Sequence, residues 1–285
     1  MPQHRPTTHP GSGPETPVIE ALHVSRTFRL GRGRDVRALV DVSVTVAPGT
    51  CLAVVGESGS GKTTLARAIV GLERFDEGEI MLAGEPVRSR QRRTELRRRS
   101  RHIQMVFQDP NGSLNRRLPV RVAVEEVLEV HLGLRGDAAR QRSGELFDTV
   151  GLGREHLDAL PSQLSGGQRQ RVAIARALAA EPAVIVLDEA VSALDVTVQA
   201  QILDMLDRLR QERGVAYLFI THDLSVVRQI ADDVVVMRRG EIVERGSVGD
   251  VLDRPQHPYT RLLLDSAPRP GWVPRRRLNT KEDTA

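Results

Sequence analysis

The segment GESGSGKTT, residues 56–64, places glycines, a lysine and two threonines at the spacing G-x-x-x-x-G-K-[ST]. Glycines at such positions let backbone N–H groups converge on phosphate oxygens without obstruction by side chains. Lys62 would reach the β- and γ-phosphates of a nucleotide, and the Thr63 hydroxyl would be a ligand for Mg²⁺. Lys281 is the only other lysine in the chain. We therefore expect a phosphate-binding loop made of Gly56, Glu57, Ser58, Gly59, Ser60, Gly61, Lys62, Thr63 and Thr64.

A chance glycine-rich turn is the alternative, and the surroundings of the loop argue against it. The apolar run 51–56 precedes the loop and predicts a buried strand, and a helical pattern follows it. Strand, loop and helix in this order provide the context that a phosphate site needs, because the positive end of the helix dipole points at the anion.

Two carboxylates, Asp188 and Glu189, end a second apolar run, VIVL. In a protein with a phosphate loop, the acid at this strand end holds Mg²⁺, commonly through water. The next acid is placed to orient and deprotonate an attacking water. By itself a strand that ends in Asp-Glu is a weak signal, but in the same sheet as a phosphate loop it predicts a metal residue at 188 and a general base at 189.

The string LSGGQRQR at 164–171 predicts a second helix start that can bind an anion. Ser165 can cap a helix that begins at Gly166-Gly167. An ordinary capped helix is the alternative interpretation. One nucleotide does not need two anion-binding helix starts from the same subunit, whereas a head-to-tail dimer would use both. In that dimer the loop at 56–63 of one chain would face 165–168 of the other.

The surrounding pattern predicts an α/β fold that would hold these residues. Two alternating segments at 18–28 and 38–46 indicate strands of an antiparallel part. Most of 109–180 is helical in pattern. Apolar strands at 183–189 and 215–223 are each followed by helical patterns, and 232–246 is typical of a hairpin that turns at Arg239-Gly240. Strands that alternate with helices indicate a mostly parallel sheet.

With these motifs in family order, the chain resembles the ATP-binding subunit of an ABC transporter. LSGGQ resembles the family signature, MVFQ (105–108) the Q-loop, SALD (192–195) the D-loop and THD (221–223) the H-switch. The resemblance implies a P-loop nucleotide-binding domain over 18–246, with a mostly parallel sheet, an antiparallel β subdomain and a helical signature subdomain at about 109–165.

The resemblance also implies a role for each motif residue. It implies that Gln108 touches Mg²⁺ and links to a membrane subunit, and that His222 contacts the γ-phosphate. Phe28 stands where the family places an aromatic that stacks on adenine, with core packing as an equal alternative. The implied catalytic residues are Glu189, His222, Lys62 and Gln108. The implied metal residues are Thr63, Gln108 and Asp188. The implied contacts to the partner's nucleotide are Ser165, Gly166, Gly167, Gln168 and Asp195.

Three further segments resemble the peptide/nickel importer subfamily, whose oligopeptide and dipeptide members carry a C-terminal extension. They are 106–115, 187–203 and, above all, QHPYTRLLLDSAP at 256–268. The extension is placed at 247–285, where the prolines by themselves predict ordered turns and an extended tail. Ala190-Val191 stand where many family members have Pro-Thr. No cysteine follows Cys51, which excludes the iron–sulfur cluster that some members of the subfamily carry there.

Composition sets limits on the other classes of protein. The 285 residues suffice for one or two domains, and 40% apolar with 27% charged residues suits a globular core. Aromatics at 3% argue against a stacking platform for single-stranded nucleic acid. Five prolines in residues 1–17 predict a disordered tail. With no apolar run long enough to span a membrane and no signal-peptide core, we expect a cytoplasmic protein.

The basic character of the chain is local. Residues 88–101 hold eight arginines and one glutamate, a net charge of +7, which leaves −3 for the rest of the chain. We therefore expect a solvated basic helix before the Q-loop rather than a DNA-binding face, with anionic lipid headgroups as a weaker alternative.

Together these features predict a subunit that hydrolyses ATP with Mg²⁺ and powers an importer of peptides or a related small solute such as nickel. The expected partners are a second ATPase, identical or related, two membrane-spanning permease subunits and, indirectly, an extracytoplasmic solute-binding protein, with no nucleic acid. The expected place is the cytoplasmic face of the cell membrane, as a peripheral subunit. The alternative is a soluble ABC ATPase in DNA repair or translation, a class that usually carries tandem domains or a long coiled-coil insertion.

Overall fold

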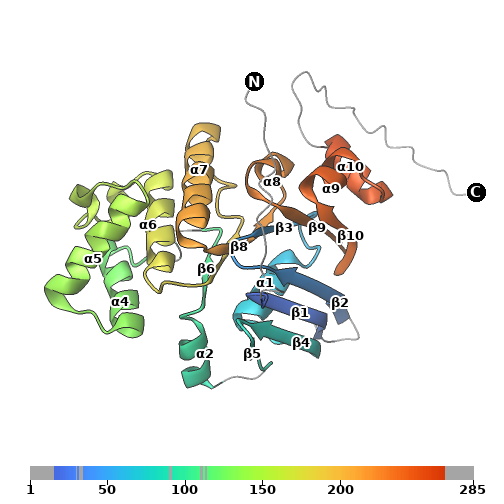
Figure 1. Cartoon of the computed structure of the whole chain (residues 1–285), viewed down its shortest axis with the longest axis horizontal. Helices are drawn as coiled ribbons and strands as arrows, with labels where there is room; N and C mark the ends of the chain where they lie inside the picture. The colour runs from blue at the N-terminus through green and yellow to red at the C-terminus, as the bar shows by residue number, and fades with distance from the viewer. Residues whose placement is uncertain are drawn as a thin grey trace, which may run out of the picture.

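A six-stranded sheet forms the centre of the molecule (Figure 1), in a computed structural model that describes residues 16–29, 31, 35–89, 92–109, 112 and 114–266. The strand order is β10-β9-β3-β8-β7-β6, with β10 antiparallel to β9 and the other pairs parallel. This confirms the predicted α/β class and its mostly parallel sheet. The strands are β3 (Cys51–Val55), β6 (Ile103–Val106), β7 (Val184–Asp188), β8 (Ala216–Thr221), β9 (Asp233–Arg238) and β10 (Glu241–Ser247).

Both faces of this sheet are covered, which explains why its strands are continuous apolar runs. Along β3, Leu52 and Val54 pack into one core, whereas Ala53 and Val55 pack into another on the opposite face. Helices cover the faces: α1 (Lys62–Val70), α7 (Val196–Arg213) and α8 (Leu224–Ile230). The hairpin between β9 and β10 turns at Arg239-Gly240, as predicted, and both residues have positive φ, 51° and 85°.

A separate four-stranded antiparallel sheet, in the order β2-β1-β4-β5, packs against α1. It is the predicted antiparallel part. Its β2 also reaches the central sheet, because the Val40 amide donates a hydrogen bond to the Gly240 carbonyl at 2.9 Å. The strands are β1 (Ile19–Arg29), β2 (Asp35–Val46), β4 (Glu77–Leu82) and β5 (Glu85–Pro86).

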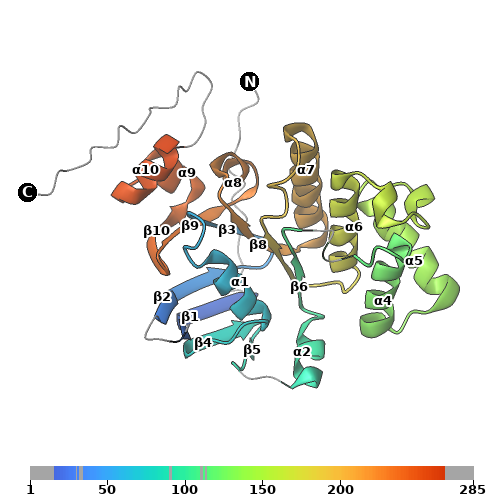
Figure 2. The same cartoon turned by 180° about the vertical axis from the view of Figure 1, so that it is seen from behind.

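The helices α4 (Val120–Leu132), α5 (Gly136–Thr149) and α6 (Gly166–Leu178) form a lobe at the side of the central sheet (Figures 1 and 2). Val124, Leu128 and Phe147 are fully buried between these helices. Short 3₁₀ turns, Arg154–His156 and Pro161–Gln163, connect α5 to α6.

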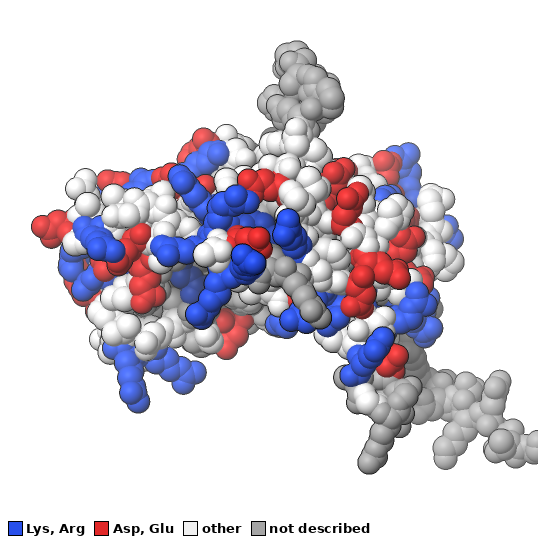
Figure 3. Space-filling model, turned by 90° about the horizontal axis from the view of Figure 1, so that it is seen from below, with Lys and Arg blue, Asp and Glu red and all other residues white. Residues whose placement is uncertain are grey.

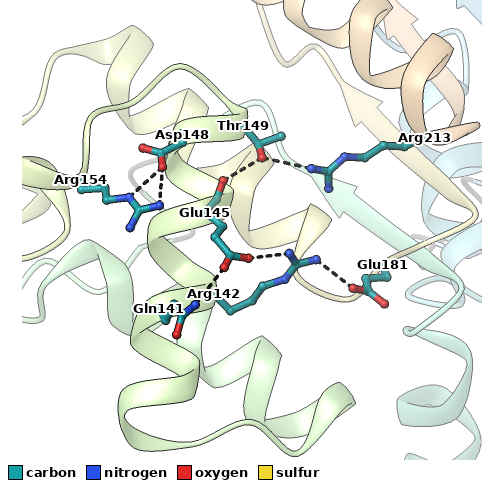
Figure 4. Close-up of polar contacts among 8 residues, drawn as sticks. All are labelled: Gln141, Arg142, Glu145, Asp148, Thr149, Arg154, Glu181 and Arg213. Carbon is teal, nitrogen blue, oxygen red and sulfur yellow. Dashed lines mark hydrogen bonds and ion pairs between the residues drawn. The ribbon is translucent and has the colours of Figure 1, made fainter.

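Polar contacts tie α5 to the central part of the molecule (Figure 4). Arg142 bridges Glu145, at 2.9 Å on its own helix, and Glu181, at 3.0 Å just before β7. The Arg213 guanidinium, at the end of α7, donates to the Thr149 hydroxyl at 3.1 Å. These polar contacts add to the apolar core that the lobe shares with the central sheet.

The arginine-rich segment contains the predicted short helix, α2 (Arg93–Arg99), which leads into β6. Basic side chains gather over α2 near the middle of the face seen in Figure 3. Arg99 is the buried exception among them, at 6% exposure.

The start of the C-terminal extension is helical, with α9 (Val248–Asp253) and α10 (Pro258–Ser266). The prediction of turns and an extended tail was wrong for Pro258. It begins α10, because the fixed φ and missing N–H of proline suit the first turn of a helix. Residues 267–285, and the predicted tail at 1–17 except for its last two residues, lie outside the described residues.

Candidate active site

The phosphate loop connects β3 to α1, as the sequence predicts. Gly61 is the N-cap of α1 with φ of 106°, a conformation that only glycine adopts readily. A Cβ at Gly61 would lie 2.3 Å from the Ala38 carbonyl oxygen of β2. The loop therefore packs closely against the antiparallel sheet at Gly61, and this contact restricts the conformation of its backbone.

Lys62 is the centre of this loop. Its side chain is buried, and Nζ donates hydrogen bonds to the carbonyls of Gly56 at 2.8 Å and Glu57 at 2.9 Å. Burial lowers the pKa of Lys62, an effect that the carboxylates of Glu189 and Asp188 oppose. A partly desolvated ammonium beside convergent amides is suited to bind phosphate.

Thr63 and Asp188 form a pair of oxygen donors next to the loop. The Thr63 hydroxyl donates a hydrogen bond to Asp188 Oδ1 at 3.1 Å. Burial raises the pKa of Asp188 despite this hydrogen bond. A buried carboxylate beside a hydroxyl fits Mg²⁺, which takes one or two protein oxygens and completes its shell with phosphate oxygens and water. Among the described residues, no group of three or more His, Cys, Asp or Glu side chains is arranged to hold a metal ion.

Glu189 brings three segments together. It follows β7 in a left-handed conformation with φ of 49°, and its amide donates to the Ile220 carbonyl of β8 at 2.9 Å. Gln108 Nε2 donates to its Oε2 at 2.9 Å, and His222 Nδ1 lies 3.5 Å from its Oε1. The left-handed backbone of Glu189 is a strained conformation of the kind common at functional sites, where the surrounding contacts hold it in place. The arrangement places the carboxylate where it can accept a proton from water.

The amide of Gln108 contacts the carboxylate of Glu189 in this structure, whereas the resemblance implied a contact with Mg²⁺. The metal role of Gln108 therefore stays a prediction. The Glu189 side chain is 19% exposed and that of His222 is 60% exposed. The histidine is thus accessible from solvent.

The signature residues begin α6 on the helical lobe. Ser165 Oγ accepts from the Gln168 amide at 3.2 Å, and Gln168 Oε1 accepts from the Ser165 amide at 2.8 Å, a reciprocal cap. A Cβ on Gly167 would lie 2.4 Å from Val198 Cγ1 of α7. Asp195 caps α7 by accepting from the Val198 amide at 2.9 Å. The starts of α6 and α7 are therefore packed as one unit.

Within the described part of the chain, no hydrogen bond or ion pair joins this unit to the phosphate loop. The structure therefore brings Lys62, Thr63, Asp188, Glu189, Gln108 and His222 together, and among the described residues it gives none of them a hydrogen bond or ion pair with Ser165, Gly166, Gly167, Gln168 or Asp195.

Phe28 lies in β1, opposite Val36 of β2. One face of its ring carries the Arg26 guanidinium, 4.6 Å from the ring centroid. Arg26 is itself held by Glu73 and Asp76, each at 2.9 Å. The contact with adenine stays a prediction.

Two contacts of the site were missed in the sequence. The Tyr259 hydroxyl of α10 accepts a hydrogen bond from the Glu57 amide of the phosphate loop at 3.1 Å. Gln168 Nε2 lies 3.0 Å from His156 Nε2. The PYT string was available as a signal for the first contact, but nothing in its residue types points at the loop.

A parallel sheet with a phosphate loop after one strand, an Asp-Glu pair ending another and a capped LSGGQ helix on a side lobe defines the class of P-loop ATPase cassettes. Comparisons with known proteins agree. A family model for "ABC transporter" matches residues 39–192, and one for "Oligopeptide/dipeptide transporter, C-terminal region" matches residues 243–284.

Curated relatives match most of the chain. The "Oligopeptide transport ATP-binding protein OppF" of Streptococcus mutans is 46% identical over 257 residues, 90% of this chain and 83% of that protein. The "Dipeptide transport ATP-binding protein DppF" of Escherichia coli is 43% identical over 260 residues, 90% and 78% of the two chains. The "Glutathione import ATP-binding protein GsiA" of Pectobacterium atrosepticum is 44% identical, over 88% of this chain and 41% of its own length.

Solved structures match as well. The ATP-binding cassette MJ0796, a dimer bound to ADP and Pi, aligns with a TM-score of 0.73 at 31% identity, over 81% of this chain and 98% of that one. CbiO1 from Clostridium perfringens, part of an ABC transporter complex, gives 0.73 at 29% identity, over 84% and 92%. The chain belongs to the ABC transporter family, and it is an ABC-type ATPase. These matches support a transporter subunit over the repair or translation ATPase considered as the alternative. No helix among the described residues is long and apolar enough to cross a membrane.

Proposed function

We propose that this ATPase hydrolyses ATP at sites shared between two ATPase subunits and thereby powers the import of peptides or a related small solute. The observation that carries the proposal is the convergence of Lys62, the Thr63–Asp188 pair and Glu189 at the end of the central sheet. The names of the relatives, which mention oligopeptides, dipeptides and glutathione, favour a peptide over nickel as cargo.

Each residue of this cluster has a chemical role in the proposal. Lys62 leaves the loop carbonyls to bind the β- and γ-phosphates, where it stabilises charge on the transferred phosphoryl group. Thr63 and Asp188 would hold Mg²⁺, which supplies neutralisation of phosphate charge when bound. Glu189 accepts the proton of the attacking water, and His222 contacts the γ-phosphate. Phe28 is the proposed contact for adenine.

The second half of each site comes from the partner subunit in this proposal. Ser165 and Asp195 are exposed at the starts of α6 and α7, and Val196 beside them is 81% exposed although apolar. The proposed contacts to the partner's nucleotide are Ser165, Gly166, Gly167, Gln168 and Asp195. Bound ATP would bridge the two subunits and favour their closure, because only the closed state offers both sets of contacts.

A groove beside the Q-loop supports a permease partner. It has a volume of about 910 Å³ and lies between α2, β6 and α4, with Leu96, Met105, Phe107 and Val122 in its lining. Leu72 and Leu118 at the groove are 54% and 39% exposed, large apolar side chains without cover. Phe107 adjoins Gln108, which contacts Glu189. We propose that a cytoplasmic segment of a permease subunit occupies this groove, which would hold the chain at the cytoplasmic face of the membrane.

The proposal is tested by affinity capture of the tagged Glu189→Gln variant from detergent-solubilised membranes, with ATP and Mg²⁺ present. We expect two multi-span permeases and a second ATPase subunit, or a second copy of this chain, to be recovered. A Lys62→Ala variant is the control and should recover less of the second ATPase. Recovery of ribosomes or nucleic acid with no membrane protein would contradict the transport function.

A further inference from the structure

The C-terminal extension touches the phosphate loop through one side chain. Tyr259 is the second residue of α10 and is 3% exposed. Its hydroxyl accepts the hydrogen bond from the Glu57 amide at 3.1 Å, across 202 positions of sequence. The Tyr259 ring packs in a core shared with Val55, the last residue of β3. The residue thus contacts the loop at Glu57, two positions after the end of β3.

The contacts that place this tyrosine begin at Glu244 on β10. The Glu244 carboxylate accepts hydrogen bonds from the amides of Gln256 at 2.7 Å and His257 at 3.1 Å. His257 Nδ1 accepts from the Tyr259 amide at 3.1 Å, so the histidine caps the helix that Pro258 begins. These contacts fix the start of α10 and therefore the direction of the Tyr259 side chain.

The β9 strand holds the ring from another side. The Arg238 guanidinium lies over the ring, 4.8 Å from its centroid, in a cation–π contact. The aromatic body is therefore held by packing and by Arg238, and the hydroxyl is the part that meets the loop. A phenylalanine at this position would keep the ring contacts and lose only the hydrogen bond.

Glu57 connects this contact to the phosphate site. Its carbonyl accepts from Lys62 Nζ at 2.9 Å and from the Ser60 amide at 3.2 Å. The amide of Glu57 is thus fixed by the extension, and its carbonyl stays fixed by the Ser60 amide within the loop when Lys62 leaves it to bind phosphate. Binding is stronger when the donors of a site are fixed in the bound arrangement beforehand, because less ordering is required.

We propose that Tyr259 is a positioning residue for ATP, through which the C-terminal extension holds the phosphate loop in its binding conformation. The inference rests on the proposed phosphate site around Lys62. It gives the extension a role in nucleotide affinity within this subunit.

The test is equilibrium binding of ATP with Mg²⁺ to full-length Glu189→Gln protein that also carries Tyr259→Phe. We expect the Kd for ATP to rise about fivefold, the equivalent of about 1 kcal/mol for one neutral hydrogen bond. With Glu189 intact, KM for ATP should rise by a similar factor and kcat should change little.

Tyr217→Phe is the matched control, because Tyr217 is the only other tyrosine in the chain and its buried hydroxyl is likewise hydrogen-bonded to the backbone, as a donor to the Leu206 carbonyl at 2.9 Å. It should leave the Kd for ATP unchanged. Hydrogen exchange of the segment 52–62 should accelerate in Tyr259→Phe and not in Tyr217→Phe.

An unchanged Kd in Tyr259→Phe, or an equal increase in both tyrosine variants, would overturn the role of Tyr259 while leaving the phosphate site intact. Undiminished ATP binding by Lys62→Ala would overturn the phosphate site itself and this inference with it.

Discussion

Gln108 donates a hydrogen bond from Nε2 to Oε2 of Glu189 at 2.9 Å, so the segment that follows β6 is attached directly to the residue proposed as the general base. The residue before it, Phe107, lines the apolar groove proposed for the permease. A segment bound in that groove would contact Phe107, and a shift of Phe107 would move the adjacent Gln108 and its hydrogen bond to the Glu189 carboxylate. This is a physical route by which transport and hydrolysis could be coupled.

Replacement of Glu189 by Gln should separate ATP binding from hydrolysis. The amide keeps the size of the side chain but cannot accept the proton of the attacking water. We expect steady-state hydrolysis to fall by about 100-fold or more, the usual contribution of a general base, with ATP affinity within about twofold of the parent. Glu212→Gln, an exposed change on α7, is the control. Hydrolysis at the parent rate would remove Glu189 from the role of base.

Gly167→Ala should disturb the packing of α6 on α7. The new Cβ would lie 2.4 Å from Val198 Cγ1, and relief of such overpacking costs about 1–3 kcal/mol. We expect a lower Tm in thermal unfolding. Gly166→Ala meets only an ordinary contact, 3.6 Å from Leu194 Cδ2, and should leave Tm nearly unchanged.

A second substitution tests the cause of this effect. The double variant Gly167→Ala with Val198→Ala removes the clashing methyl groups and should recover part of the Tm lost by the single variant. If the loss of Tm in the double variant equals the sum of the losses in Gly167→Ala and Val198→Ala alone, the clash is not the cause.

Glu244→Gln should weaken the docking of α10 in a pH-dependent way. Burial raises the pKa of the Glu244 carboxyl, but the hydrogen bonds it accepts, among them those from the Gln256 and His257 amides, lower the pKa by more. An acid with a depressed folded-state pKa adds stability that is present above its unfolded pKa, about 4.3, and is lost as the pH falls through the folded pKa.

We therefore expect Glu244→Gln to lower Tm by about 2–4 °C at pH 7, the shift expected for about 1 kcal/mol in a domain of this size. The difference from the parent should shrink as the pH falls below about 4.3. Glu241→Gln, an exposed change on the same strand, should show no such dependence. A difference in Tm that grows toward low pH would contradict the assignment.

The parts of the site that local sequence determines were predictable. The apolar run before Gly56 and the helical pattern after Lys62 place the phosphate loop, and the run that ends at Asp188 places the second strand end. Both signals depend on residues next to each other in the chain. The confirmed hairpin turn at Arg239-Gly240 is of the same kind.

The parts that depend on distant packing were not predictable. The need for glycine at Gly167 comes from Val198 on another helix, and the hydroxyl of Tyr259 meets a loop that lies 202 positions away. The prolines of the extension predict ordered turns and an extended tail, and this is wrong for Pro258, because proline by itself signals turns and helix starts alike. The helix follows from the cap that His257 and Glu244 provide, which the spacing of residues does not reveal.

The central claim is that Lys62 and its loop bind the phosphates of ATP, and the most direct measurement is the Kd of the purified full-length chain for ATP with Mg²⁺. Lys62→Ala should weaken binding by about 10- to 100-fold, as expected for lost hydrogen bonds from a charged donor. Lys281→Ala, which removes the only other lysine of the chain and lies outside the described residues, should bind like the parent. An unchanged Kd in Lys62→Ala would contradict the account.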